Sequence, residues 1–246
     1  MCSVSETKND PAFFIQGCSD LGIALSEDQV KQFMTFYDLL IEKNKVMNLT
    51  AITDFNDVVV KHFLDSLLIA RHVDFCKVSN ILDMGTGAGF PGIPLKIVFP
   101  EIKVTLADSL NKRILFLNEV IEKCHLGKVG TVHTRAEDLG RNENYREKYD
   151  LVVSRAVANL STLTEYCLPF AKKGGMFVSY KSAAVDDEFR NAGKAIRILG
   201  GTCDSPEEDR IPGTDLGRSF VVIRKIKPTP GRYPRKAGLP GKEPII

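Results

Sequence analysis

The sequence predicts an α/β protein with a mostly parallel seven-stranded sheet, helices on both faces and an N-terminal helical extension. Two observations lead to this prediction. From Asn80 onward, short apolar runs alternate with helical patterns, which is typical of a parallel sheet covered by helices. Directly after the first apolar run, Gly85, Gly87 and Gly89 alternate in a turn of the kind that joins strand to helix in nucleotide-binding folds. With 246 residues, 43% of them hydrophobic, one large core is expected.

The region before the first strand is predicted to be helical. Its first ten residues are polar and are expected to be disordered. Ser26 and Gln29 fit a capping box, and apolar residues follow at helical spacing. The expected helices cover residues 11–22, 26–45 and 57–72. In the last of them Lys61, His62, Asp65 and Ser66 share a face, which is either solvated or a wall of the substrate pocket.

The remaining elements follow from periodicity and from the positions of glycine and proline. The expected strands are 81–84, 103–107, 130–134, 149–154, 176–180, a weak one near 202, and 219–226. The expected helices are 90–99, 111–125, 159–172 and 186–199. The proline-rich tail is predicted to form no regular element and to lie on the surface or wrap the domain. The chain therefore divides into a helical extension (1–75), a central domain (76–227) and a basic tail (228–246).

Charge and cysteine content narrow the function. The formal net charge is only +2, but basic residues crowd the segment 218–242, which favours a phosphate-rich partner over the alternative of a solvated tail. The six cysteines are scattered without a C-x-x-C pair, so neither disulfides nor a metal site are expected. We expect a cytoplasmic protein, because the sequence shows no signal peptide and no apolar run long enough to span a bilayer. We also expect it to be a monomer.

Polar residues recur where five successive strands end, and ligands bind at that edge of a parallel sheet. These groups are residues 83–89, Asp108, residues 135–138, residues 154–155 and residues 180–182. A ligand cleft explains five such groups better than chance does.

The glycine pattern indicates which ligand. An acidic residue, Asp83, precedes strictly alternating glycines, whereas dinucleotide-binding proteins use G-x-G-x-x-G. The pattern resembles motif I of the class I, Rossmann-like methyltransferases that depend on S-adenosylmethionine. The resemblance implies that the glycine turn approaches the methionine part, that Asp108 holds the ribose, and that Ala136 and Glu137 border the adenine. The implied cofactor-binding residues are Gly85, Gly87, Gly89, Phe90, Asp108, Ala136, Glu137 and Arg155.

Further motifs resemble one family within that class, RsmG, also called GidB, which methylates N7 of a guanine in bacterial 16S ribosomal RNA. They are Asn48-Leu49-Thr50, residues 61–66, residues 83–92, Arg135-Ala136-Glu137, Ser154-Arg155-Ala156 and residues 233–238. The resemblance implies small-subunit ribosomal RNA as the partner. It implies positioning roles for Arg155, His62 and Lys181. The predicted RNA-binding residues are Lys61, His62, Arg218, Arg232, Arg235 and Lys236.

The expected chemistry needs no dedicated base, because guanine N7 carries a free lone pair and in-line transfer relies on alignment. The sequence lacks the Asn/Asp-Pro-Pro-aromatic loop of amine methyltransferases, and Cys167 is expected in the core. For Arg155 a structural role, paired with Asp83 or Glu137, is the alternative to contact with the cofactor or with guanine O6. Three other functions stay open: a dinucleotide-dependent oxidoreductase, an RNA-binding ribosome-assembly factor without turnover, and a methyltransferase with another RNA target.

Overall fold

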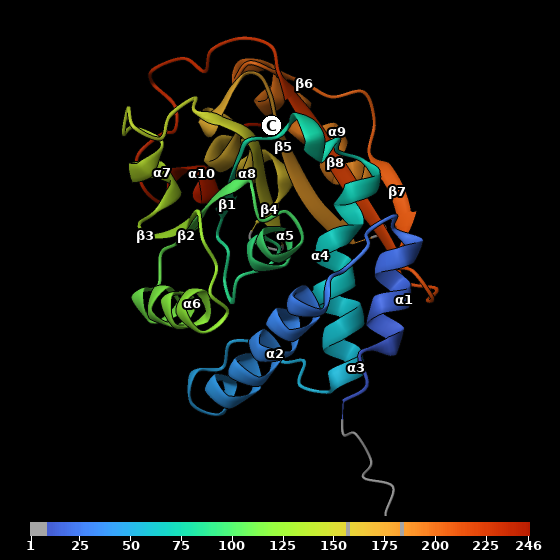
Figure 1. Cartoon of the computed structure of the whole chain (residues 1–246). Coiled ribbons are helices and arrows are strands. Elements are labelled where there is room, and N and C mark those ends of the chain that lie inside the picture. The colour runs from blue at the N-terminus through green and yellow to red at the C-terminus, as the bar shows by residue number, and fades with distance from the viewer. Residues whose placement is uncertain (1–8, 156–157, 183–184) are drawn as a thin grey trace, which may run out of the picture.

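The computed structural model describes residues 9–155, 158–182 and 185–246 (Figure 1). Residues 1–8, most of the segment expected to be disordered, lie outside the described residues. So do Ala156, the last residue of the Ser154-Arg155-Ala156 motif, and Val157. The described chain folds around one sheet with helices on both faces (Figure 1), which confirms the predicted class.

The sheet contains eight strands among the described residues. They are β1 Asn80–Met84, β2 Lys103–Asp108, β3 Val129–His133, β4 Tyr149–Arg155, β5 Ala171–Ser182, β6 Gly201–Thr202, β7 Glu207–Arg210 and β8 Gly217–Lys225. Seven of them follow the order β3-β2-β1-β4-β5-β8-β6, and β7 pairs with β8. The first five are parallel, and β8 runs antiparallel to β5. The sheet order reverses next to β1, so the carboxyl ends of β1 and β4 flank a crevice where ligands bind in such sheets.

Two predictions about this sheet need correction. The short strand β7 was not predicted, because its sequence Glu-Glu-Asp-Arg has no apolar alternation. The helix expected over 159–172 ends earlier: α8 covers Leu160–Cys167, a 3-10 turn follows, and β5 already begins at Ala171. A register shift at Tyr149 and a left-handed Gly174 let this early part of β5 pair with β4.

The helices pack in two layers. They are α1 Ala12–Asp20, α2 Glu27–Met47, α3 Phe55–Val58, α4 Asp65–Leu67, α5 Gly92–Val98, α6 Asn111–Lys123, α7 Ala136–Leu139, α8, α9 Asp186–Ile198 and α10 Leu239–Lys242. One apolar cluster joins α1, α2, α5 and α6 to the sheet, and a second cluster joins α8 and α9 to its other face. The capping box of Ser26 and Gln29 at the start of α2 is present.

The N-terminal helices share a core with the sheet. Phe14, Phe33, Phe36 and Phe63 contact one another in a continuous aromatic group that reaches Phe90, beside the glycine turn. The predicted helix over 57–72 is interrupted by a π-helix, η1 Val59–Leu64, and ends in a 3-10 helix, η2 Leu68–Arg71. π-Helical turns are rare in proteins, and those that do occur are often found at functional sites. This one carries Lys61 and His62.

The tail wraps the domain as expected, but it is not wholly irregular. It contains the short helix α10, which begins at Leu239 with Pro240 in its first turn, where the missing N–H costs no hydrogen bond. Thr229 and Tyr233 are buried against the body of the protein.

Candidate cofactor and RNA site

The turn after β1 is built by glycines in the left-handed region. Gly85, Gly87 and Gly89 have φ values of 72°, 63° and 98°, which side chains with a Cβ rarely adopt. A Cβ on Gly89 would lie 2.6 Å from Ile93, whereas one on Gly87 would meet nothing within 4 Å. Gly87 therefore leaves open space beside the turn, and the backbone can approach a ligand closely there.

Asp108 lies at the end of β2, directly beside this turn, and is buried. Its carboxylate accepts hydrogen bonds from the N–H groups of Gly87 (3.0 Å) and Leu110 (2.9 Å) and from Arg113 Nη1 (3.1 Å). Arg113 was not predicted as a site residue, and nothing in its position along α6 indicates the contact. A ribose that binds Asp108 competes with this guanidinium.

Two adjoining hollows flank Asp108. The glycine hollow, about 360 Å³, is lined by Leu49, Thr50, His62, Gly85, Thr86, Gly87, Ala88, Phe90, Asp108, Ser109, Arg113 and Arg155. The β3 hollow, about 220 Å³, is lined by Met84, Gly85, Asp108, Ser109, Thr134, Arg135, Ala136, Glu137, Ser154, Leu163, Tyr166 and Gly238. They share Gly85, Asp108 and Ser109, so together they form an elongated space across the ends of β1, β2 and β3.

The residues of these hollows fit S-adenosylmethionine. The open space beside Gly87 accommodates an elongated ligand, and Asp108 supplies acceptors for hydroxyl groups. Asp83, fully buried behind the turn, accepts hydrogen bonds from Thr86 Oγ1 (2.7 Å) and Gly92 N–H (2.8 Å). Its other oxygen, Oδ1, has no partner among the described residues, and burial raises the pKa of the carboxyl to about 6.

Ala136 and Glu137 begin the short helix α7 and line the β3 hollow, and their contact with the adenine stays a prediction. Glu137 is buried and accepts a hydrogen bond from Gly238 N–H (2.8 Å), so the C-terminal tail borders the β3 hollow. Tyr166 also contacts the Glu137 carboxylate, and its pKa is raised by burial and by that charge. Tyr166 was not predicted as a site residue, and Gly238 was predicted only as part of the tail motif.

Arg155, at the end of β4, stands between the glycine hollow and a third one. Its guanidinium lies 5.0 Å from the centre of the Phe90 ring, and Phe90 stacks on His62 with ring centres 4.6 Å apart. Burial, followed by the charge of Arg155, lowers the pKa of His62 to about 4, so the imidazole is neutral at physiological pH. His62 Nε2 lies 2.8 Å from Thr50 Oγ1, which ties the loop at Thr50 to the same wall.

The ion-pair partner of Arg155 within the described chain is Asp65, in place of the Asp83 or Glu137 that the structural alternative named. Arg155 Nη1 donates to Asp65 Oδ2 at 2.7 Å, and Arg218 Nε donates to Asp65 Oδ1 at 2.5 Å. Asp65 is buried, so the two guanidinium groups are fixed around one carboxylate. Asp65 belongs to the polar face recognised in the sequence, but periodicity gives no indication of its two partners.

The third hollow, here the arginine hollow, has a volume of about 350 Å³. Its lining residues are Lys61, His62, Asp65, Arg155, Tyr180, Lys181, Ser182 and Arg218. Lys61 pairs with Asp57 at 2.9 Å, and Lys181 pairs with Glu188 at 2.6 Å. Four of the eight lining residues are lysine or arginine, and each of them pairs with a carboxylate, so an anionic ligand in this hollow would share these cations with Asp57, Asp65 and Glu188. The structure thus brings together Lys61, His62, Arg155, Lys181 and Arg218.

The other predicted RNA-binding residues lie in the tail, outside the lining of this hollow. Arg232 packs on Tyr233, with its guanidinium carbon 5.1 Å from the ring centre, and Lys236 is exposed. Arg235 instead binds the buried Glu165 through Nε and Nη2, at 3.0 and 2.7 Å. Contact with RNA stays a prediction for all three, but the surroundings of Arg235 favour a structural role.

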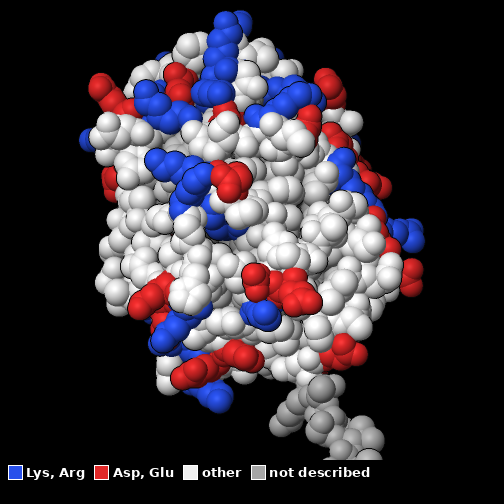
Figure 2. Space-filling view, viewed as in Figure 1, with Lys and Arg blue, Asp and Glu red and all other residues white. Residues whose placement is uncertain are grey.

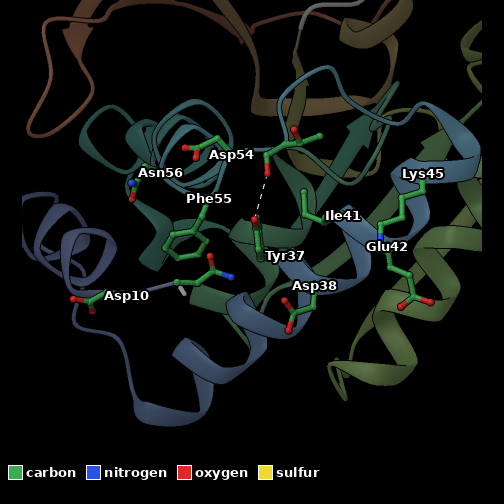
Figure 3. A pocket seen from close by; sticks show the side chains of 11 residues that line it. Asp10, Tyr37, Asp38, Ile41, Glu42, Lys45, Asp54, Phe55 and Asn56 are labelled. Carbon is green, nitrogen blue, oxygen red and sulfur yellow. Dashed lines mark hydrogen bonds between the residues drawn. The ribbon is translucent and has the colours of Figure 1, made fainter. Parts of the chain in front are cut away.

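A larger hollow than these three lies elsewhere, between α2 and the start of α3 (Figure 3). It has a volume of about 830 Å³, and its charged residues are Asp10, Asp38, Glu42, Lys45 and Asp54. Figure 2 shows acidic side chains interspersed with basic ones at the lower end of the molecule, over α2 and α3. Carboxylates repel phosphate groups, so we do not place RNA there. Among the described residues no cluster is suited to a metal ion, and no helix is long and apolar enough to cross a membrane.

A mostly parallel sheet with a glycine turn after β1, a buried carboxylate at the end of β2 and a hollow beside β3 is the arrangement of an S-adenosylmethionine-dependent methyltransferase. A solved structure, TrmN from Thermus thermophilus, shares this fold with a TM-score of 0.50 and 14% identity, over 68% of this chain and 53% of that one.

Comparison with known sequences narrows the class. Residues 29–206 match the family model GidB, rRNA small subunit methyltransferase G, and the chain belongs to this family. Ribosomal RNA small subunit methyltransferase G of Desulforamulus reducens is 51% identical, over 94% of this chain and 96% of that protein. The protein of the same name from Lachnoclostridium phytofermentans is 50% identical over 96% and 98%. The family match confirms the predicted enzyme and cofactor, and the oxidoreductase interpretation is wrong.

Proposed function

We propose that this chain transfers the methyl group of S-adenosylmethionine to N7 of a guanine in small-subunit ribosomal RNA. One observation carries the proposal: Arg155 lines both the glycine hollow and the arginine hollow. A guanine base bound in the arginine hollow would therefore lie next to a cofactor bound over the glycine turn. The relatives are named as methyltransferases of small-subunit ribosomal RNA, which supports the same substrate.

The electrostatics of the arginine hollow support attack by a ring nitrogen. Its carboxylate, Asp65, is held by two arginines and is not available as a base. The pKa of His62 is lowered to about 4, so at neutral pH the side chain is the uncharged imidazole and is a weak base. N7 needs no deprotonation before it attacks, so positioning and alignment suffice.

S-adenosylmethionine supplies the methyl group, which is attached to its positively charged sulfonium sulfur. We assign its binding to the glycine turn, to Asp108 for the ribose, and to Ala136 and Glu137 for the adenine edge. Arg155 orients the guanine, where donors can address O6 while N7 stays free. Lys61, Lys181 and Arg218 then face the RNA, and Arg232 and Lys236 extend the contact to phosphates.

We extend the proposal to the organisation of the chain. Residues 1–75 act as a helical extension, 76–227 as the methyltransferase domain and 228–246 as a basic tail. The enzyme acts in the cytoplasm, where its ribosomal substrate is assembled, and as a monomer. Size-exclusion chromatography with light scattering tests the last point, and a dimeric mass would contradict it.

The decisive experiment is nucleoside analysis of small-subunit ribosomal RNA treated with the protein and labelled cofactor. The label is expected in 7-methylguanosine. RNA with 7-deazaguanosine at the modified position should take up no label, because carbon replaces the attacking nitrogen. Label in any other nucleoside, or in the deaza substrate, would overturn the proposal.

A further inference from the structure

The C-terminal tail lies against the cofactor site. Gly238 lines the β3 hollow, and its N–H donates to Glu137 at 2.8 Å, inside the segment assigned to the adenine. Gly238 has a φ of 81°, so a glycine is needed for the chain to turn at this point. A tail that left the surface would open the hollow and remove one donor from a buried carboxylate.

The anchor of the tail is Arg235. Its backbone N–H donates to Glu165 Oε1 at 2.8 Å, and its guanidinium binds both oxygens of the same carboxylate. Glu165 is fully buried in α8, so this is a fixed ion pair three residues before Gly238. Paired carboxylate and guanidinium groups with this fork geometry are among the strongest polar contacts in proteins.

Backbone contacts hold the tail on both sides of the anchor. Arg146 donates to the carbonyl groups of Thr229 (2.7 Å) and Tyr233 (2.8 Å), and Arg141 donates to that of Pro234 (2.9 Å). Beyond Gly238, Thr162 Oγ1 donates to the carbonyl of Pro240 at 3.0 Å. Side chains from the segment after α7 and from α8 therefore fix the path of the tail past the hollow.

We propose that residues 233–238 are a fixed wall of the adenosine end of the cofactor site, and that Arg235 is a positioning residue for cofactor binding. The inference rests on the proposed placement of the cofactor. It separates the tail cations into two groups. Arg235 has its charge compensated by Glu165 and acts on the cofactor through Gly238 and Glu137, whereas Arg232 and Lys236 face solvent.

The test measures binding of S-adenosylhomocysteine and of 5′-methylthioadenosine, which keeps the adenosine but lacks the amino-acid part, by calorimetry on the full-length chain. Arg235→Gln should weaken both ligands by a similar factor of roughly 10 to 100, the range of one lost charged hydrogen bond. Arg232→Gln makes the same change of charge earlier in the tail and should leave cofactor affinity within about twofold. Arg235→Lys should recover part of the loss.

Two further variants keep the result interpretable. Phe14→Leu, in the aromatic group of the N-terminal helices, supplies a folded protein of lowered stability, and its cofactor affinity should be unchanged. If Arg235→Gln does not fold, Glu165→Gln with Arg235→Gln removes the uncompensated buried charge and takes its place. Equal affinity of the folded anchor variant and the wild type for both adenosine ligands would overturn the inference. Label in a nucleoside other than 7-methylguanosine would instead overturn only the proposed function.

Discussion

Replacing Asp83 by asparagine should change how stability depends on pH. Asp83 is fully buried, and its pKa is raised from 3.8 to about 6 by desolvation. The folded state thus binds the proton more tightly than the unfolded state. The resulting stabilisation is complete below pH 3.8 and is lost as pH rises through 6, up to a total of about 3 kcal/mol for a shift of about two pKa units. Asparagine does not titrate, so the variant lacks this loss.

The assay is urea unfolding of wild type and Asp83→Asn between about pH 5 and 7.5. Over that interval the wild type should lose about 1.4 kcal/mol relative to the variant, because the carboxyl ionises within it. Asp28→Asn, a change on the exposed first turn of α2, is the matched control and should track the wild type. A stability difference between wild type and Asp83→Asn that stays constant across the interval would refute the raised pKa and its assignment to burial.

Three further predictions concern the site. Asp108→Ala should weaken S-adenosylmethionine binding by roughly 1.5–3 kcal/mol, the value of a charge-assisted hydrogen bond, and Gly87→Val should weaken it by filling the open space beside the turn. Unchanged affinity of both folded variants in calorimetry would contradict the assignment of the cofactor site. Neutralising Arg232 and Lys236 together should lower the log–log salt slope of RNA binding by about 2, one unit per phosphate contact, and an unaltered slope would make them solvated residues. The single-turnover rate of methyl transfer should be nearly independent of pH from about 6 to 9, since His62, with a pKa of about 4, is already neutral there. A tenfold rise of this rate per pH unit would point to a different target atom.

The sequence predicts the parallel core well, because local patterns suffice there. Each of β1 to β4 lies within two residues of its predicted bounds, and the capping box at Ser26 is present. The left-handed glycines and the buried Asp108 follow from a turn whose chemistry is contained in a few consecutive residues.

The parts that could not be predicted depend on contacts between distant residues. Nothing local in the sequence shows that Asp65 binds Arg155 and Arg218, or that Arg235 binds Glu165. Charge counting places Arg235 among RNA-binding residues, since a sequence does not reveal which cations are neutralised by a buried carboxylate. The π-helical turn η1 is likewise invisible, because its apolar spacing resembles that of an α-helix.

The pairing of Asp65 with two arginines has a consequence for the order in which the molecule folds. The partners lie 90 and 153 positions away along the chain, and Glu137 meets Gly238 across 101 positions. Contacts of such high sequence separation close large loops and form late. During synthesis the glycine turn therefore emerges long before the segments that complete the two hollows. A nascent chain that has not yet reached Gly238 therefore carries motif I without the contacts that complete the two hollows.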